Sequence, residues 1–366
     1  MAIQKIRVGI IGVQPDRSWA ALAHIPALRA MPEQYDITAI STTRQESANA
    51  AATHYGIPRG YGHHAPLVNA PDVDLVAVTV KVPHHYEIVK AALEAGKMVY
   101  CEWPLGNGLP EAEELAALAK AKDVRTVVGL QAQFAPPLAY ARDLVEQGYV
   151  GEVLSASVIG TGMNWGECVD APNAYTADRK NGATMLTIPV SHTVDGVCSM
   201  LGEIRAVSAL LVNRRHSTIL ADTGEALALT AEDQVAFVAT LQGGAVLTAH
   251  YRGGMTKGTG LLLEINGTRG DLRLTSIGGH AQIFDMELSG AAAGQEEMQK
   301  LQVPAKYYHT ALHTGPAVNV AEVYAQLARD VRDGTCICPD FHHAVLRHRM
   351  VEAIERASET GQRQSL

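Results

Sequence analysis

The chain has 366 residues, of which 47% are hydrophobic and 19% charged, and its formal net charge at pH 7 is −8. This length exceeds that of one ordinary core and predicts two domains, while the composition is that of a globular protein. The negative charge offers no basic surface to phosphates. It therefore argues against direct binding to nucleic acid or to anionic membranes.

Five cysteines are scattered along the chain, and their odd number favours a reducing compartment over a disulfide framework. The N-terminal segment lacks the layout of a secretory signal, because its apolar run is short and leads at once into a turn at Gly12. No apolar run approaches the length of a membrane span. A soluble, cytoplasmic protein is therefore expected.

Metal ligation is not expected from the paired ligand residues. Cys336 and Cys338 lack the second half of a zinc site and are interpreted as loop thiols. Adjacent histidines do not face one way on a helix, and no cysteine or acid completes a tetrahedral set around them. These histidine pairs are His63-His64, His84-His85 and His342-His343.

Residues 7–30 predict a strand, a turn and a helix. An apolar run from Val8 ends at Gly12, and Ser18 opens an Ala/Leu-rich segment with helical spacing. A helix that begins just past a buried parallel strand presents free N–H groups to a phosphate. Only Gly12 fills its place in the G-x-G-x-x-G fingerprint, because Gln14 stands at the second glycine. A nucleotide site and an ordinary first βα unit both remain open.

Up to about residue 130, β-type runs alternate with helical segments, which predicts a doubly wound parallel sheet. The predicted strands are 35–41, 73–80, 98–101 and 124–130, and the predicted helices are 45–55, 84–95 and 110–122. A ligand is expected at the carboxyl ends of such strands. Ser41, Lys81, Glu102 and Gln131 lie at these ends.

From Gly151 onward, β-type runs follow one another closely with turn signals between them, which predicts a mostly antiparallel sheet. The predicted strands are 153–160, 204–213, 234–241, 245–251, 261–266, 272–275 and 280–286; helices are predicted at 317–333 and 341–360, and a mobile surface loop at 291–300. The predicted fold class is α/β followed by α+β. Residues 1–132 would form a dinucleotide-binding Rossmann domain, and 133–366 a substrate-binding and oligomerisation domain whose C-terminal helix can pack back on the first.

Six segments match one protein family as a set: VGIIG at 8–12, HIPAL at 24–28, VPHHYEIVKAALEAGKMVYCEWPLG at 82–106, GYVGEV at 148–153, SHTVD at 191–195 and NGTRGDL at 266–272. With them the chain resembles the glucose-fructose oxidoreductase and inositol dehydrogenase (Gfo/Idh/MocA) family over nearly its whole length. SWAALAHIPAL, VKVPHHYEIVK and CEWPLG are most similar to the branch of the fungal galactose/lactose-metabolism regulatory protein, an NAD(P)-binding co-repressor without evident dehydrogenase activity.

The resemblance implies catalytic residues that this chain keeps only in part. Family enzymes carry Glu-Lys-Pro after the fifth strand, with the lysine near the substrate hydroxyl and a cis bond before the proline, whereas this chain has Trp103 in place of the lysine. The family aspartate four residues before the histidine is also missing, because Ile188 stands four before His192 and Thr187 five before.

His192 is therefore the candidate acid/base, since an imidazole titrates near neutral pH. Lys81 and Thr187 are candidate orienting donors, and Lys81 could substitute for the missing ammonium. The alternatives are a His192 that caps a helix and a Lys81 that binds loop carbonyls.

Cofactor choice is predicted where the second strand ends. That end carries Ser41 and Arg44 but no acid, and an arginine suits a 2′-phosphate, so NADP(H) is favoured over NAD(H). The alternative is that Arg44 is only an exposed first-turn residue. The expected cofactor contacts are Gly12, Gln14, Arg17, Ser18, Trp19, Ser41, Arg44, Val80, Lys81, Pro83, His85, Glu102, Trp103 and Gln131.

Aromatic residues could wall a carbohydrate-sized pocket, because aromatic faces pack on sugar rings, and the alternative is core packing. The candidate substrate contacts are Trp103, Asn164, Trp165, Tyr175, Arg179 and His192. The predicted function is NAD(P)-dependent hydride transfer between nicotinamide and a hydroxyl or keto carbon of a sugar, cyclitol or related ring. The alternative is a non-catalytic NAD(P)-binding regulator with a protein partner, and in either case a homo-oligomer, a dimer or a tetramer, is expected.

Overall fold

The computed structural model describes residues 5–366 and divides into two compact units. Unit 1 comprises the chain up to Leu130 together with Tyr308–His348, and unit 2 comprises Gln131–Tyr307 and Arg349–Leu366. The segment Tyr308–His348, which the sequence division assigned to the second domain, thus belongs to unit 1. The expectation about an N-terminal signal falls partly on residues 1–4, outside the described residues. Within 5–366, no helix is long and apolar enough to cross a bilayer.

Unit 1 is built on a six-stranded sheet in the order β3-β2-β1-β4-β5-β6, and every neighbouring pair is parallel. The strands are β1 (Ile6–Ile11), β2 (Tyr35–Ser41), β3 (Arg59–Tyr61), β4 (Leu75–Val78), β5 (Met98–Glu102) and β6 (Thr126–Gly129). Most of their residues are buried, as expected for parallel strands that are covered on both faces. The predicted Rossmann sheet is confirmed.

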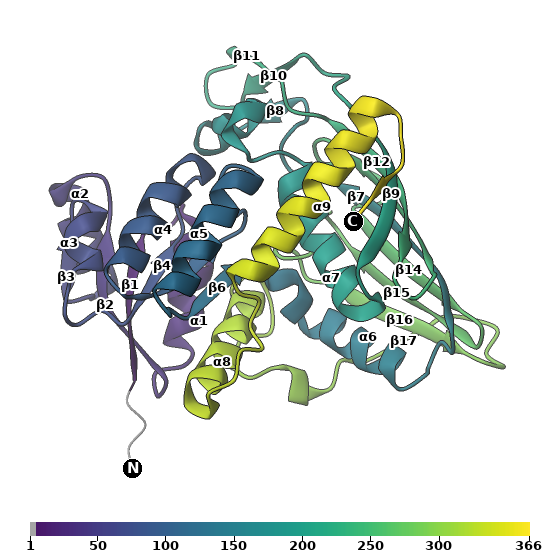
Figure 1. Ribbon diagram of the computed structural model, residues 1–366, viewed down its shortest axis with the longest axis horizontal. Helices are drawn as coiled ribbons and strands as arrows, with labels where there is room; N and C mark the ends of the chain where they lie inside the picture. Colours follow the sequence, from purple (N-terminus) through teal and green to yellow (C-terminus); the bar gives the residue numbers. More distant parts are fainter. Residues whose placement is uncertain (1–4) are drawn as a thin grey trace. The chain divides into compact units, whose positions relative to one another are not determined.

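Helices cover this sheet, and Figure 1 shows α4 and α5 side by side in front of its strands. The helices of the unit are α1 (Ile25–Arg29), α2 (Gln45–Tyr55), α3 (His64–Val68), α4 (His85–Glu94), α5 (Leu109–Ala121), α8 (Ala317–Asp333) and the start of α9 (Phe341–Thr360). The helix predicted to open at Ser18 begins instead as a wide π-helical turn, Ala20–His24, before α1. In that turn the N–H of Ile25 donates to the carbonyl of Ala20, and Pro26, which has no N–H, follows.

Unit 2 contains a nine-stranded sheet in the order β17-β16-β15-β14-β7-β13-β12-β9-β18, and only the β7–β13 pair is parallel. Its strands are β7 (Val153–Thr161), β9 (Ile204–Val212), β12 (Gln234–Leu241), β13 (Val246–Arg252), β14 (Leu261–Gly267), β15 (Gly270–Ser276), β16 (Glu287–Ala292), β17 (Gln299–Lys300) and β18 (Gln364–Ser365). The predicted mostly antiparallel sheet is confirmed.

Smaller elements complete unit 2. The helix α6 (Pro136–Glu146) packs against β15 and β16, and α7 (Ser191–Leu201) packs against α6. A second sheet of three short strands has the order β11-β10-β8. These strands are β8 (Cys168–Val169), β10 (Ser217–Leu220) and β11 (Ala226–Ala228).

Two predicted segments differ from the structure. The strand predicted at 280–286 is wrong, because the N–H groups of Ile283 and Phe284 both donate to the carbonyl of His280 and close a turn. His280, Ala281 and Gln282 are buried in succession, which the alternating faces of a half-exposed strand do not allow. The segment 291–300, predicted as a loop, joins the end of β16 to β17 in an antiparallel hairpin.

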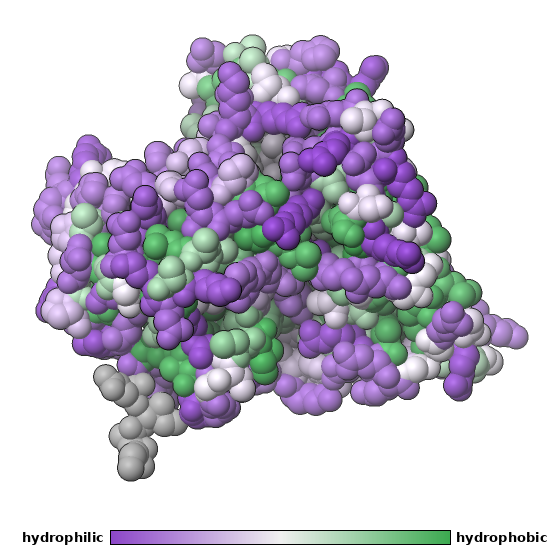
Figure 2. Space-filling view, in the orientation of Figure 1, coloured by the Kyte–Doolittle hydropathy of each residue, from purple (hydrophilic) through white to green (hydrophobic). Residues whose placement is uncertain are grey.

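The outward face of the large sheet carries exposed apolar side chains. Ile159, Leu210, Val238 and Val246 are 36%, 59%, 52% and 41% exposed, and they lie on β7, β9, β12 and β13. Figure 2 shows apolar side chains exposed at the right of the view, over the strands of this sheet. An apolar face of this kind is a common surface for contact with another chain.

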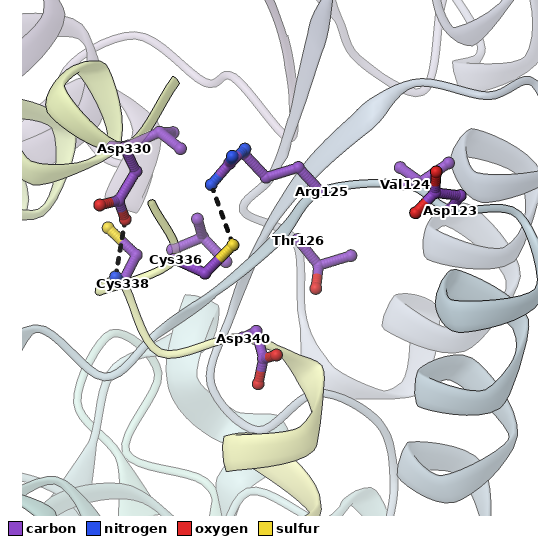
Figure 3. Close-up of a pocket in the computed structure, with 10 residues that line it drawn as sticks. Asp123, Val124, Arg125, Thr126, Asp330, Cys336, Cys338 and Asp340 are labelled. Carbon is purple, nitrogen blue, oxygen red and sulfur yellow. Dashed lines mark hydrogen bonds between the residues drawn. The ribbon is translucent and has the colours of Figure 1, made fainter. Parts of the chain in front are cut away.

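A cavity of about 380 Å³ in unit 1 lies beside the first residues of β6 and the segment that follows α8. Figure 3 shows the Asp330 carboxylate close to the N–H of Cys338, and Arg125 close to the thiol of Cys336. The cavity lies at the amino end of β6, opposite to the strand ends where a ligand of a parallel sheet is expected. None of the predicted cofactor or substrate residues lines it.

Asp330 organises the segment beside this cavity. The side chain is fully buried, and its carboxylate accepts hydrogen bonds from Gln326, Thr335 and the N–H groups of Ile337 and Cys338 at 2.6 to 2.9 Å. Burial acts to raise the pKa of Asp330, but these hydrogen bonds outweigh it and hold the pKa below its ordinary value. The ionised carboxylate therefore stabilises the fold.

We expect Asp330→Asn to lower the free energy of unfolding by about 1 to 3 kcal/mol at pH 7, because an amide cannot accept all four bonds. A lowered folded-state pKa contributes stability above the unfolded pKa of about 3.8, and this contribution is lost as the pH falls through the folded-state value. Urea denaturation should therefore show the difference from wild type shrinking below about pH 3.8. Asp333→Asn, an exposed neighbour, is the control; an equal loss in both variants would contradict the role of Asp330.

Candidate functional site

The parallel sheet of unit 1 brings several predicted residues to one edge. Because neighbouring strands run in one direction, β1, β2 and β4 end side by side, with Ile11 in register with Ser41 and Val78. The N–H of Gly12 donates to the carbonyl of Ser41 at 3.0 Å, just past the strand ends. Lys81 follows β4 and Trp103 follows β5, so this edge is the candidate nucleotide site.

Gly12 is required where the chain turns away from β1. Its φ of +103° lies in the region that favours glycine. A Cβ at this position would lie 2.9 Å from Val80 Cγ1 and 3.1 Å from the carbonyl oxygen of Thr79. The chain that follows β4 therefore packs directly against the turn after β1, and only a residue without a side chain fits between them.

The loop after Gly12 is closed by its own hydrogen bonds. The hydroxyl of Ser18 accepts from the N–H of Gln14 and donates to its carbonyl, both at 2.9 Å, and the N–H of Ser18 donates to the same carbonyl at 3.1 Å. The hydroxyl and the N–H of Ser18, an expected cofactor contact, are therefore both engaged within the loop. The indole N–H of Trp19 is buried and has no hydrogen-bond partner, and Arg17 is exposed. The orphaned indole N–H fits an acceptor group of a bound nucleotide.

The end of β2 is where the sequence predicts the preference for NAD or NADP. Ser41 is buried there and Arg44 is exposed. Arg44 precedes α2 in extended conformation, and its carbonyl accepts from the hydroxyl of Thr42 at 2.9 Å. Arg44 is thus the N-cap residue of α2, and no acidic residue lies between the end of β2 and this helix. This arrangement suits an anionic group.

His85 joins two strand ends and does not present a free nitrogen. Its ring nitrogens lie 2.9 Å from the carbonyl oxygen of Val80 and 2.7 Å from that of Pro104, and the ring is fully buried. Burial lowers the pKa of His85, although these two carbonyls act to raise it. The imidazole therefore packs between the ends of β4 and β5, while Lys81 and Pro83 are exposed next to it in the chain.

Glu102 ends β5 and belongs to a buried polar chain. It accepts from Nε2 of His24 at 2.9 Å, and Nδ1 of the same ring lies 2.8 Å from the hydroxyl of Tyr324. The hydroxyl of Tyr35 in turn donates to the carbonyl of Tyr324 at 2.7 Å. Glu102 thus ties the end of β5 to α8, a role in fixing structure that the sequence did not indicate.

Trp103 stands at the end of β5 with a partner that the sequence analysis missed. The Trp103–Pro104 bond is cis, as the resemblance implied, and the indole is 4% exposed. The ring of His348 on α9 packs against it with centroids 4.6 Å apart. Burial lowers the pKa of His348 to about 4, and its Nε2 has no hydrogen-bond partner. Nothing in the local spacing of α9 connects this histidine with Trp103.

In unit 2, His192 lies in the first turn of α7. A π-helical turn, Leu186–Val190, precedes it and contains Pro189, and the hydroxyl of Ser191 donates to the carbonyl of Leu186 at 2.8 Å. The His192 ring is 3% exposed, and its Nδ1 has no hydrogen-bond partner. The alternative of a helix-capping histidine is not what the structure contains, because no side chain caps α7.

Burial also governs the charge of His192. Desolvation lowers the pKa of His192 to about 3, Asp195 on the same helix acts to raise it, and His280 lowers it further. The imidazole is therefore neutral at pH 7. Asp195 is buried and accepts from the side-chain amide of Gln133 at 2.8 Å.

The remaining predicted residues of unit 2 serve mainly to build it. The hydroxyl of Thr187 donates to the carbonyl of Gly182 at 2.8 Å, and Gln131 is fully buried. Tyr175 is half-buried, and burial raises its pKa to about 12. Arg179 is exposed and paired with Glu355 at 2.9 Å. Trp165 is 2% exposed, which corresponds to the core-packing alternative, and Asn164 beside it is half-buried.

No metal site emerges from the part of the chain that the structure describes, since residues 5–366 contain no group of three His, Cys, Asp or Glu side chains arranged to hold an ion. The rings of His63 and His64 lie 4.2 Å apart, and Nδ1 of His63 accepts from the N–H of Ala65. His63 thus serves as the cap of α3.

A six-stranded parallel sheet with a glycine just past its first strand is the arrangement of a dinucleotide-binding Rossmann fold. Residues 6–130 match the oxidoreductase family with an NAD-binding Rossmann fold, and residues 136–276 match the C-terminal domain of Gal80p. The dehydrogenase aclE of Aspergillus oryzae is 30% identical over 370 residues, which cover 98% of each chain. The chain therefore belongs to the Gfo/Idh/MocA family of NAD-binding oxidoreductases.

Regulators and dehydrogenases both occur among the similar proteins. The galactose/lactose metabolism regulatory protein GAL80 of Saccharomyces cerevisiae is 28% identical over 305 residues, which cover 77% of this chain and 69% of the yeast protein. A structure of a super-repressor mutant of Gal80p has a TM-score of 0.89 at 24% identity, covering 99% of this chain and 98% of the other. Levoglucosan dehydrogenase in complex with NADH and levoglucosan has a TM-score of 0.86 at 21% identity, with 99% of each chain covered. These structures establish the shared fold.

We expect Gly12→Ala to destabilise unit 1 more than Gly56→Ala does. Both glycines have positive φ, but a Cβ at Gly56 meets nothing within 4 Å, so that variant bears only the left-handed penalty of about 1 to 2 kcal/mol. Gly12→Ala adds contact with the backbone of Thr79. Thermal denaturation measures both variants, and equal melting temperatures would show that the strand end is not crowded.

Proposed function

We propose that the protein is an NAD(P)-dependent oxidoreductase that transfers a hydride between nicotinamide and a hydroxyl or keto carbon of a sugar, cyclitol or related ring. The observation that carries this proposal is the state of His192. Its imidazole is buried, its Nδ1 has no hydrogen-bond partner, and Asp195 acts to raise its pKa, so the ring offers a nitrogen to the proton of a substrate hydroxyl.

The residues of unit 1 that would hold the nucleotide are Gly12, Trp19 and Arg44. Gly12 gives the tight turn that ends β1, the indole N–H of Trp19 offers an unused donor, and Arg44 offers a cation beyond β2. When bound, nicotinamide supplies the hydride acceptor or donor. The exposed Lys81 is a further donor for the nucleotide or the substrate.

His192 acts as general base during oxidation of the ring carbon. Its neutral imidazole takes the proton of the substrate hydroxyl while the hydrogen on the same carbon leaves as hydride, so the carbon becomes a ketone. Asp195 stabilises the imidazolium that results, because its carboxylate opposes the desolvation that lowers the pKa of His192. In the reverse direction His192 returns the proton to the new alkoxide.

The substrate class is supported by the relatives. The relative aclE is called a dehydrogenase, and levoglucosan dehydrogenase has been solved in complex with NADH and levoglucosan. Asn164 in unit 2 is half-buried and offers an amide to hydroxyl groups. We propose NADP(H) as the favoured cofactor, with NAD(H) as the alternative, because the end of β2 carries no acid that would select NAD and Arg44 follows it closely.

A non-catalytic regulator that binds NAD(P) and a protein partner is the second candidate. One specific observation favours it: Trp103 replaces the lysine of the family enzymes, and an indole cannot act as an ammonium does. The match of 136–276 to the C-terminal domain of Gal80p points in the same direction.

Self-association and location stay predictions. The exposed apolar residues on the outward face of the large sheet support a homo-oligomer, a dimer or a tetramer. All five cysteines are free thiols, which supports a cytoplasmic location. Neither observation supports direct contact with nucleic acid or membrane.

Titration with NADPH and NADH, followed by nicotinamide fluorescence, tests the proposal. We expect binding, and turnover when levoglucosan and a panel of sugars and keto-sugars are added. His192→Ala should abolish turnover and leave nucleotide affinity unchanged, because the imidazole acts on the substrate proton. His250→Ala, an exposed histidine of the same unit, is the control. Tight binding without turnover by any panel member would favour the regulator, and absence of binding would contradict both.

Arg44→Ala tests the cofactor choice. Loss of a charge-assisted contact to a 2′-phosphate should raise the Kd for NADPH by roughly 10-fold or more and leave that for NADH unchanged. Arg59→Ala, which removes an exposed arginine paired with Asp72, is the control. Equal effects on the two nucleotides would show that Arg44 is only an exposed first-turn residue.

A further inference from the structure

The cavity of about 380 Å³ in unit 1 lies at the opposite end of the strands from the candidate nucleotide site. Its lining comes from two segments, residues 123–127 at the start of β6 and residues 327–340 from the end of α8 to the start of α9. A volume of this size falls within the range of small-molecule sites, roughly 300 to 1,000 Å³. Some of the lining groups already have partners, and the others remain for a ligand.

Three of the lining side chains are used by the fold itself. Four hydrogen bonds occupy the carboxylate of Asp330, and the thiol of Cys338 donates to the carbonyl of Val323 at 3.6 Å. The hydroxyl of Thr126 accepts from the N–H of Phe341 at 3.3 Å. The polar atoms of these three side chains therefore hold the wall of the cavity together.

Arg125 offers the cavity a guanidinium with spare donors. Its Nη1 donates to the carbonyl oxygen of Thr335 at 2.6 Å and to the sulfur of Cys336 at 3.5 Å. These contacts hold the side chain in place, and Figure 3 shows it extending from the start of β6 toward Cys336. Nε and Nη2 of Arg125 donate to no group among the described residues. This free edge of the guanidinium suits a carboxylate, which it can bind through two parallel hydrogen bonds.

Two carboxylates, Asp123 and Asp340, belong to the same lining. Asp123 is exposed, and within residues 5–366 its side chain accepts no hydrogen bond. Asp340 precedes α9, and Oδ1 accepts from the N–H of His343 at 2.9 Å, whereas Oδ2 is used by no other part of the described chain. Carboxylate oxygens of this kind bind an ammonium group through charge-assisted hydrogen bonds.

Apolar side chains complete the lining. Val127 and Leu327 are buried beside the cavity, and Val124 is half-buried. They offer contact to a hydrocarbon chain. The cavity therefore combines one guanidinium, two carboxylates and an aliphatic wall.

This combination distinguishes between classes of ligand. A phosphate would gain the guanidinium of Arg125 but would be repelled by Asp123 and Asp340. A diamine would gain the two carboxylates but would be repelled by Arg125. A metal ion is not favoured, because nowhere in residues 5–366 do three His, Cys, Asp or Glu side chains come together to hold one. A molecule with both a carboxylate and an ammonium complements all three charged side chains.

We propose that this cavity binds an aliphatic amino acid. The carboxylate of the ligand lies on Nε and Nη2 of Arg125, and its ammonium lies at Asp123 and Asp340. Its hydrocarbon chain contacts Val124. The site is separate from the candidate nucleotide site, so the inference does not depend on the proposed oxidoreductase activity. α-Amino and ω-amino acids share this chemistry, and their affinities distinguish them.

Isothermal titration calorimetry of the full chain with L-leucine and with ε-aminocaproate tests the site. We expect binding, and the amino acid with the lower Kd shows which separation of charges fits the cavity. The matching acids, isocaproate and caproate, and the matching amines, isoamylamine and hexylamine, should bind at least about 10-fold more weakly, because each lacks one charge. Binding of neither amino acid, or an equal affinity for the matching acid or amine, would overturn the proposal.

Asp123→Asn and Arg125→Lys test the two ends of the ligand. Asparagine tolerates the φ of +50° at this position, so Asp123→Asn should keep the melting temperature of wild type. Arg125→Lys keeps a cation but loses the paired N–H groups. We expect each variant to raise the Kd of the amino acid by roughly 10-fold.

Asp333→Asn is the matched control, because Asp333 is an exposed carboxylate at the end of α8 that does not line the cavity. Its Kd should equal that of wild type. An unchanged Kd in Asp123→Asn and Arg125→Lys, or an equal rise in Asp333→Asn, would overturn the proposal. The result is independent of whether the protein binds NADPH, so it is distinguishable from a failure of the proposed function.

Discussion

Parallel strands that end at one edge are the constraint on which unit 1 depends. Their shared direction brings Gly12, Ser41, Lys81 and Trp103 together although they are far apart in the sequence. Backbone carbonyls at such an edge also need partners, and His85 lies against those of Val80 and Pro104. The strand ends that form a ligand site therefore also bind nearby polar side chains, which are then not available to a ligand.

Burial of imidazoles is the corresponding theme in unit 2. Desolvation keeps His192 and His280 neutral at pH 7, and the hydrogen bonds then decide what each can do. His280 accepts from the N–H of Met163, whereas Nδ1 of His192 has no partner. The residue type alone does not give the charge of either ring, because the surrounding packing lowers the pKa of both.

Much of the fold could be predicted from the sequence, because the spacing of apolar residues and the residues that form turns are properties of short segments. The bounds of α2, α8 and β12 are those of the predicted segments, and both sheets have the predicted character. The strand predicted at 280–286 was wrong, because an apolar run does not reveal whether its residues alternate between two faces or are all buried. The candidate site was less predictable, since Glu102 and Thr187 bind groups distant in the sequence or in irregular loops.

The sequence by itself determined the order of the elements, the strand-end position of the candidate site and the family, because these depend on periodicity and on short motifs. Only the tertiary structure decided which polar groups are already engaged. It paired Ser18 with Gln14, packed His348 on Trp103 and set Tyr251 between α7 and the turn at His280. Those outcomes depend on contacts between segments far apart in the chain, and on burial, which no local pattern of residues encodes.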